Sequence, residues 1–291
     1  MINAALILEG GSLRSVYTAG VLDVMMENGL EFAYVIGTSS GALCAGNYIA
    51  KEIGRSARIN IMHSNDRNYF GFGRYFKTGS IFNYDYLYNE PINRLYPYAE
   101  DRFLASKQRF VITATNCNTG EAEYFEKHTY DEMTNALTAS SSIPLLTKIA
   151  YVDGIPCLDG SGAAPIGLHK AIADENEKII IVLTRDLDYK KDDVKAIVRF
   201  FLKRKYKRYP QLVERLLSQP QLYNKLIEEI RELEKQKKVF IVRPSKPLKI
   251  RQTERDARTL FEGYLRGRDN MLSLLPDLKN YLEEKTKLEC L

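Results

Sequence analysis

The sequence predicts an α/β domain with a mainly parallel central sheet and a helical C-terminal elaboration. Its first 50 residues alternate strand, helix, strand and helix, which is typical of parallel strands joined by crossover helices. The apolar run Ile179–Leu183 has the length and the β-branched residues of a buried strand. After Asp186 the composition changes to highly charged helical segments. We therefore expect an α/β core over residues 1–186 and a helix-rich elaboration over 187–291, packed on the same domain.

The opening elements follow from local signals. Ala4–Leu8 is continuously apolar and runs into a pair of glycines, as expected of a buried parallel strand. Tyr17–Asn28 carries apolar residues at helical spacing. Phe32–Ile36 then predicts a second strand, which is broken by Gly37 and followed by a helix of small residues over Ala42–Ala50.

Later elements are predicted with the same rules. Strands are expected at three further apolar runs: Phe110–Thr115, Lys178–Thr184 and Val239–Val242. Between the second and third strands, Asn68–Tyr98 is rich in Tyr, Phe, Gly and Asn, which predicts an irregular surface segment lying over a site. Residues 191–237 are expected to be helical, and Glu254–Lys287 is expected to supply two more helices.

The composition is that of an ordinary globular protein of 291 residues, with 45% hydrophobic and 27% charged residues. Lys plus Arg number 42 against 37 Asp plus Glu, an excess too small to indicate a nucleic-acid partner. No run reaches the roughly 18–20 apolar residues that span a bilayer, and the N-terminus resembles a first strand rather than a signal peptide. We expect a cytoplasmic protein whose scattered cysteines are free and mostly packed: Cys44, Cys117, Cys157 and Cys290.

A G-x-S-x-G pentapeptide, Gly37-Thr38-Ser39-Ser40-Gly41, lies between the second predicted strand and its helix. A nucleophile elbow needs this context, because a tight strand-to-helix turn presents the serine hydroxyl and the helix N-terminus favours a developing oxyanion. Gly37 and Gly41 would permit the tight turn. The alternative is a turn of small residues that merely packs a helix on the sheet.

The loop Glu9–Arg14 directly follows the first predicted strand. Because successive parallel strands end at the same edge of a sheet, this loop is expected beside Ser39. The amides of Gly10, Gly11 and Ser12 could converge on an oxyanion, and Arg14 could add charge or brace the loop. A nucleotide phosphate loop is disfavoured, since neither G-x-G-x-x-G nor Gly-Lys-Ser/Thr is present here.

A serine nucleophile also needs a base. The chain has three histidines (His63, His128 and His169), and none follows a strand end in the manner of a triad histidine. A carboxylate is the alternative: Asp159, followed by Gly160, is preferred over Asp153 because its glycine-rich continuation permits close approach. An aspartate near its reference pKa of about 3.9 is a weak base, so burial or a short hydrogen bond would have to assist it.

Several of these segments together resemble the patatin-like phospholipase family, and the likeness covers most of the chain. The segments are Leu6–Arg14, Ala19–Asp23, Val35–Ala42, Ala139–Pro144 and Leu158–Ser161. Three shorter pieces are similar to a bacterial branch of that family: Thr184-Arg185, Val242–Ser245 and Tyr264–Gly267. One departure is Ser161, which stands where the family usually has Gly or Ala and adds a side chain close to the site.

The resemblance implies a three-layer α/β/α fold that acts on lipid acyl esters through a Ser–Asp dyad. It implies Ser39 as the nucleophile, Asp159 as the proton acceptor and the loop from Gly10 to Arg14 as the oxyanion stabiliser. Neither a cofactor nor a metal is expected, because the sequence shows no cluster of His, Asp and Glu ligands. Two rival functions remain open: a catalytically silent lipid- or protein-binding module, and a thioesterase or acyltransferase on the same fold.

Peripheral contact with an anionic membrane is a further expectation. From Lys195 to Arg208 there are seven basic residues and no acidic one. In and just before this segment, Val194, Ile197, Val198, Phe201 and Leu202 recur at three- and four-residue spacing and form one apolar stripe on a helix. Such a helix lies in a membrane interface, or else its stripe packs on the protein's own core and its charges face the solvent.

Overall fold

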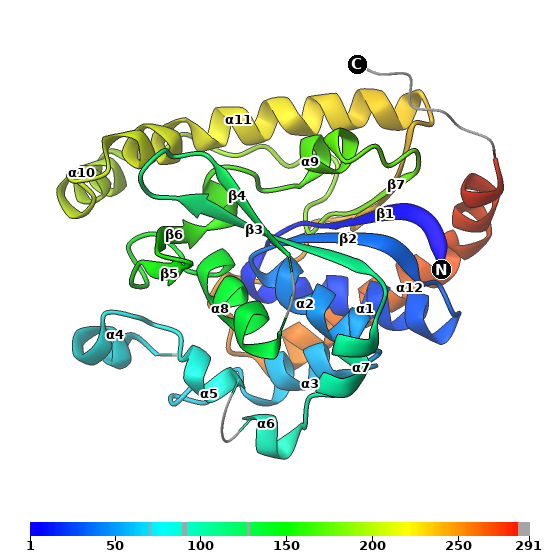
Figure 1. Cartoon of the computed structure of the whole chain (residues 1–291), viewed down its shortest axis with the longest axis horizontal. Helices are drawn as coiled ribbons and strands as arrows, with labels where there is room; N and C mark the ends of the chain where they lie inside the picture. Colours follow the sequence, from blue (N-terminus) through cyan, green and yellow to red (C-terminus); the bar gives the residue numbers. More distant parts are fainter. Residues whose placement is uncertain (70, 89–91, 127–128, 285–291) are drawn as a thin grey trace.

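The computed structural model describes residues 1–69, 71–88, 92–126 and 129–284. They form one eight-stranded sheet of order β5-β6-β3-β2-β1-β7-β8, with β4 paired to β3 (Figure 1). The strands are β1 (Ile2–Leu8), β2 (Phe32–Thr38), β3 (Arg109–Asn116), β4 (Ala122–Glu126), β5 (Ala150–Val152), β6 (Ile155–Asp159), β7 (Ile179–Val182) and β8 (Val239–Val242).

The strands predicted from apolar runs form the parallel part of the sheet. Strands β3, β2, β1, β7 and β8 run parallel to one another, with β1 at the centre. The strands that the sequence analysis missed are β4, β5 and β6, which run antiparallel to their neighbours. Strands β4 and β5 are short and mostly not buried, and the short, largely buried β6 contains Pro156. Neither the periodicity nor the composition of these three segments therefore distinguishes them from loops.

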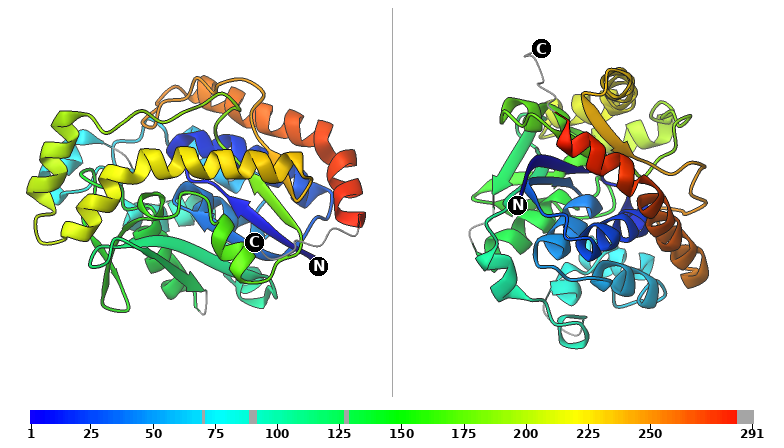
Figure 2. Two further views of the ribbon diagram at one scale, coloured as in Figure 1. Left: turned by 90° about the horizontal axis from the view of Figure 1, so that it is seen from above. Right: turned by 90° about the vertical axis from the view of Figure 1, so that its right-hand side faces the viewer.

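Helices cover both faces of the sheet. The longer ones are α1 (Ser15–Glu27), α2 (Ser40–Ile49), α3 (Arg55–Met62), α8 (Tyr130–Ser140), α10 (Ala196–Lys205), α11 (Pro210–Lys235) and α12 (Ala257–Glu283). Side chains of α1, α2, α8 and α12 share one core with one face, and those of α11 and the short α9 (Leu168–Ala173) share a second core with the other. Figures 1 and 2 show these layers. The predicted three-layer α/β/α fold is therefore confirmed.

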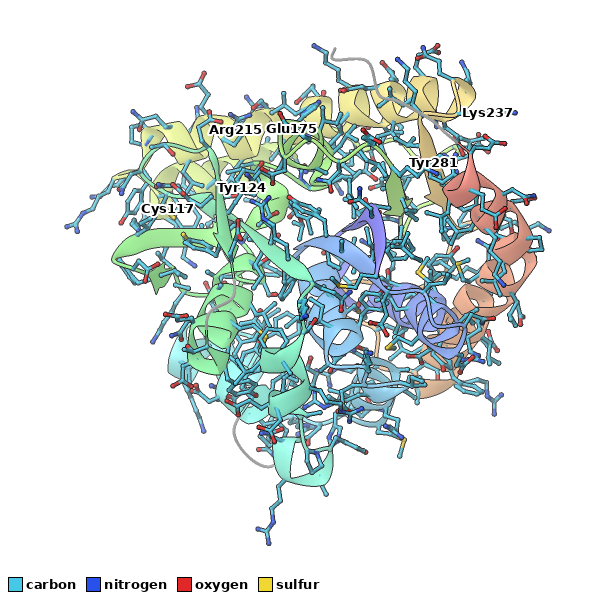
Figure 3. All side chains as sticks on the ribbon, turned by 45° about the vertical axis from the view of Figure 1, so that its right-hand side comes forward. Cys117, Tyr124, Glu175, Arg215, Lys237 and Tyr281 are labelled. Carbon is cyan, nitrogen blue, oxygen red and sulfur yellow. The ribbon has the colours of Figure 1, made fainter. Side chains whose placement is uncertain are left out.

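The C-terminal helices are present as predicted, but their number differs. One helix, α12, replaces the two expected over Glu254–Lys287, of which residues 285–287 lie outside the described chain. It continues through Pro276 because buried residues on both sides, including Leu260 and Leu278, hold it on α1 and the sheet. The hydroxyl of Tyr281, labelled in Figure 3, accepts a hydrogen bond from the Ile179 amide (3.1 Å) and ties the helix end to β7.

The C-terminal region also contributes to the sheet, because β8 pairs with β7. The division at residue 186 stays a prediction. Three of the four cysteines, Cys44, Cys117 and Cys157, are free and buried, as expected. Cys290 lies outside the described residues.

The segment Asn68–Tyr98 is more ordered than the sequence suggested. It contains the short helices α4 (Phe72–Thr78), α5 (Tyr84–Tyr88) and α6 (Ile92–Leu95), and α7 (Glu100–Ala105) follows it. The expectation of irregular chain was wrong because apolar residues here, among them Ile81 and Leu87, bury one another in a cluster of their own. The hydroxyl of Tyr84 donates to the Ser141 carbonyl at 2.6 Å, which brings this segment to the C-terminal end of α8.

Candidate active site

Ser39 occupies a sharp turn between β2 and α2. Its backbone adopts φ 55° and ψ −129°, a strained conformation for a residue with a side chain. Gly37 and Gly41 permit this turn, since a Cβ at Gly37 would lie 2.5 Å from Ala42 Cα and one at Gly41 would collide with the Leu8 carbonyl oxygen. The pentapeptide therefore has the geometry of a nucleophile elbow.

Asp159 lies at the end of β6 and meets Ser39 across 120 residues of sequence. The Ser39 Oγ donates a hydrogen bond of 2.6 Å to Asp159 Oδ2, and both residues are buried. The other oxygen, Oδ1, accepts from the amide of Ser161 at 2.8 Å and from its hydroxyl at 2.6 Å. Burial raises the pKa of Asp159, although the hydrogen bonds from Ser161 and Ser39 act in the opposite direction. The result is a buried carboxylate that is more basic than an exposed one.

A short serine-rich segment at the end of α8 bridges these two residues. The Ser39 amide donates to Ser140 Oγ at 2.8 Å, and the Asp159 amide donates to the Ser142 carbonyl at 2.8 Å. Gly160 lets the chain pass close to β3, since a Cβ there would collide with the Thr113 carbonyl oxygen. Sequence reasoning assigned no role to Ser140 or Ser142, although both lie in a segment that carried the family resemblance.

The other candidate bases lie elsewhere. Asp153 is exposed in the turn between β5 and β6. The ring of His63 faces Asp66 at 3.5 Å, and His169 is exposed and pairs with Glu229 at 3.0 Å. His128 lies outside the described residues. Of the described candidates, Asp159 is the one hydrogen-bonded to Ser39.

The loop after β1 lies against Ser39, as predicted. A Cβ at Gly10 would come within 2.9 Å of the Ser39 Cβ, so a glycine is needed for this approach. The Gly11 amide donates to Ser40 Oγ at 2.9 Å and is not a free oxyanion donor in this structure. The Ser12 hydroxyl donates to the Gln252 carbonyl at 2.8 Å.

Three amides remain available beside the Ser39 hydroxyl. Those of Gly10, Ser12 and Ser40 donate to no acceptor within the described part of the chain. Ser40 is the first residue of α2, where the helix dipole favours negative charge. Sequence reasoning did not name Ser40 as a donor, although the residue after an elbow serine commonly serves in this way.

Two cavities meet at Ser39. The first is walled mainly by apolar and aromatic side chains of α2, α3, α5 and α8, which include Leu43, Ile59, Leu87, Tyr88, Met133 and Leu137. The second contains Asp159 and is lined by charged side chains from the loops after β1 and β7. Arg14 belongs to this polar cavity: it is 7% exposed, and burial lowers its pKa to about 10.

Comparison with known proteins places this chain in a family. The sequence profile described as patatin-like phospholipase matches residues 6–172, which is more than half of the chain. The chain belongs to the patatin-like phospholipase family. This membership confirms the resemblance inferred from the motifs and places the chain in a family of lipid hydrolases. A second profile, described as a domain of unknown function (DUF6363), matches residues 209–283, so the two matches lie on opposite sides of residue 186.

Two individual proteins are similar to this patatin-like chain. The uncharacterized protein YjjU of Escherichia coli K12 is 28% identical over 186 residues, which cover 62% of this chain and about half (51%) of that protein. The crystal structure of VipD from Legionella pneumophila aligns with 94% of this chain and 66% of its own, at 12% identity and a TM-score of 0.43.

Among the described residues of this patatin-like protein, no helix is both long enough and apolar enough to cross a bilayer. Nor does that part of the chain contain a group of three or more His, Cys, Asp and Glu side chains placed to hold a metal ion.

Proposed function

We propose that this protein is a serine lipid acyl hydrolase in which Ser39 is the nucleophile and Asp159 the proton acceptor. The observation that carries the proposal is the 2.6 Å hydrogen bond from Ser39 Oγ to a buried carboxylate, formed at a strained strand-to-helix turn. A short hydrogen bond to a desolvated carboxylate assists removal of the serine proton as the hydroxyl attacks.

The reaction proceeds in two halves. Ser39 Oγ attacks the ester carbonyl carbon while its proton passes to Asp159. The resulting oxyanion is stabilised by the amides of Ser40, Gly10 and Ser12. The intermediate then collapses: the leaving alcohol takes the proton from Asp159, and an acyl-enzyme remains. Water next gives its proton to Asp159 and attacks the acyl carbonyl, so the carboxylic acid leaves and Ser39 regains its proton.

The apolar cavity suits the acyl chain of the substrate. Its walls come from α2, α3, α5 and α8, and it begins at Ser39 itself. Burying each methylene of an acyl chain there would contribute about 0.8 kcal/mol. Esters whose acyl chain enters this apolar cavity are therefore the substrate class proposed.

Membrane contact through residues 195–208 is part of the proposal, and the exposure of α10 supports it. Only part of the predicted apolar stripe is buried: Leu202 is buried and Val194 is partly buried. The stripe residues Ile197 (60% exposed), Val198 and Phe201 face the solvent. Phe200, which is 56% exposed, lies beside them. The helix lies at one end of the molecule (Figure 1), where the Lys205 ammonium lies 5.8 Å from the centre of the Tyr75 ring of α4. Exposed aromatic residues beside lysines and arginines suit a surface of anionic lipids.

A fluorophosphonate probe and an acyl-ester panel test the function. The probe should label wild type and a control variant at an exposed serine, Ser273→Ala, but not Ser39→Ala. Wild type and Ser273→Ala should release fatty acid from the acyl esters, whereas Ser39→Ala should release none. Absence of labelling in wild type would favour the silent binding module. Transfer of the acyl group to an added alcohol or thiol, without release of free acid, would favour the acyltransferase.

A further inference from the structure

The polar cavity beside Ser39 contains three cationic side chains: Arg14, Arg185 and Lys191. Arg14 follows β1, whereas Arg185 and Lys191 follow β7. Because β1 and β7 pair in parallel, the segments that follow them leave the same edge of the sheet side by side. Sequence reasoning noted Arg14 but could not place the other two cations beside it.

None of these cations forms an ion pair with a carboxylate in the described part of the chain. The buried Nε of Arg14 has no hydrogen-bond acceptor there. The guanidinium of Arg185 instead stacks 3.9 Å from the centre of the Tyr189 ring. The Lys191 ammonium donates to the neutral amide of Gln219 at 3.1 Å and lies 4.2 Å from the centre of the Tyr223 ring.

Two carboxylates, Glu9 and Asp159, are found among the described residues that line the cavity, and both already accept hydrogen bonds from neutral donors. Glu9 Oε2 accepts from the amide (2.6 Å) and hydroxyl (3.0 Å) of Thr184, and Oε1 accepts from the Tyr223 hydroxyl at 2.8 Å. Asp159 is held by Ser39 and Ser161. Three cations therefore face two carboxylates, and neither carboxylate forms an ion pair with them within the described residues.

The cationic cluster is preorganised, and the two carboxylates compensate it only in part. Asn224 of α11 fixes the backbone of Lys191, accepting from its amide at 2.8 Å and donating to its carbonyl at 3.0 Å. Burial is the main cause that lowers the pKa of Lys191 to about 8; the charges of Glu9 and Asp159 act in the opposite direction, and those of Arg185 and Arg14 add to the lowering. Holding three cations together beside only two carboxylates is unfavourable, so an anion that enters the cavity would be stabilised by the excess positive charge.

We infer that Arg14, Arg185 and Lys191 form an anion subsite that binds a phosphate group of the lipid substrate beside the scissile ester. This inference rests on the proposed function and adds a substrate preference to it. With the acyl chain in the apolar cavity, the phosphate would occupy the polar cavity, which Ser39 also lines. The cluster would thus favour phosphate-bearing esters over neutral esters of the same chain length.

A matched pair of substrates tests the preference: lysophosphatidic acid and monoacylglycerol with the same acyl chain, which differ in the phosphate. Wild type should show the higher kcat/KM for the phosphate ester. Arg185→Gln with Lys191→Gln should lower the ratio of the two kcat/KM values by about 10- to 100-fold, mainly through KM, because charge-assisted hydrogen bonds are lost. Lys190→Gln, an exposed neighbour outside the cavity, is the control and should leave the ratio unchanged.

A binding measurement separates this inference from the proposed hydrolysis. Calorimetric titration with inorganic phosphate should show binding to wild type and to Lys190→Gln, and much weaker binding to the double variant. Equal binding by all three proteins would overturn the subsite even if the esters are hydrolysed. Loss of phosphate binding with an unchanged kcat/KM ratio would mean that the site takes free phosphate, and the substrate preference would be wrong. If neither ester is hydrolysed, the titration still decides whether the anion subsite exists.

Discussion

Ser161 and Asp159 are joined by two hydrogen bonds that converge on one carboxylate oxygen. The Ser161 hydroxyl and amide donate to Oδ1 at 2.6 and 2.8 Å, while Ser39 donates to Oδ2 at 2.6 Å. The carboxylate is thereby held between the Ser161 side chain and the candidate nucleophile. Ser161 is the departure from the family pattern, and the geometry gives its hydroxyl a positioning role.

Replacing Ser161 by Ala should move the pH dependence of the reaction. Burial holds the pKa of Asp159 above its ordinary value of 3.8, and the Ser161 hydroxyl lowers it. Asp159 must be ionised to accept the serine proton, so activity falls as the pH decreases through its pKa. Losing the hydroxyl should raise that pKa, shift the acid limb of the kcat/KM profile to higher pH and lower kcat roughly tenfold.

The profile is measured with a neutral ester, so that the substrate does not titrate. Ser161→Thr keeps the hydroxyl and should restore an acid limb close to that of wild type. An Ala variant with an unshifted limb would show that Ser161 has no influence on the ionisation of Asp159.

Ser39→Ala and Asp159→Asn should each remove most of the esterase activity, and the double variant should be little worse than either. The two side chains act on the same proton, so losing one makes the other ineffective, and their effects are not additive. The measurement is kcat for a soluble ester, with circular dichroism to verify folding. Full activity of Asp159→Asn would reject the dyad.

Glycine substitutions should separate a catalytic effect from a folding effect. Gly10→Ala places a methyl group within 2.9 Å of the Ser39 Cβ and should disturb the oxyanion site. Loss of one donor typically costs about 10²–10³-fold in kcat. Gly41→Ala directs its methyl group at the rigid backbone of β1 and should chiefly lower the unfolding temperature.

Gly73→Ala is the matched control for both, because no atom lies within 4 Å of the added Cβ. Its kcat and unfolding temperature should stay near those of wild type. If the Gly10→Ala variant unfolds instead of folding with a lower kcat, Gly10 is required for the turn and the proposed effect on the oxyanion site is not supported.

Binding to anionic vesicles should depend on α10. Phe200→Ser with Phe201→Ser should reduce co-sedimentation with vesicles that contain phosphatidylserine, because these exposed rings are the apolar part of the proposed contact. Replacing Lys203, Arg204 and Lys205 by Gln should reduce the co-sedimentation further and weaken its dependence on salt.

Phe261→Ser removes an exposed ring from α12 and serves as the control that should bind like wild type. Vesicle binding that does not change with salt, with lipid charge or with any of the α10 substitutions would contradict the membrane proposal. It would not affect the assignment of Ser39 and Asp159.

The sequence by itself determined the parallel part of the sheet and the turn at Ser39. Apolar runs such as Ala4–Leu8 identify buried strands because a strand buried on both faces is continuously apolar, and this run is too short for a helix and is soon followed by two glycines. The pentapeptide identifies the turn because its two glycines flank a serine between a predicted strand and a predicted helix. The sequence also supplied Asp159 as a candidate base and favoured it over Asp153, because the glycine-rich continuation after Asp159 permits close approach.

Only the tertiary structure decided which groups meet at Ser39. The antiparallel return of β6 along β3 brings Asp159 to the serine, and the pairing of β1 with β7 brings Arg185 and Lys191 to Arg14. It also showed that the Gly11 amide is occupied by Ser40. Local periodicity contains no information about strand order. These contacts depend on that order, since residues far apart in sequence become neighbours when their strands pair.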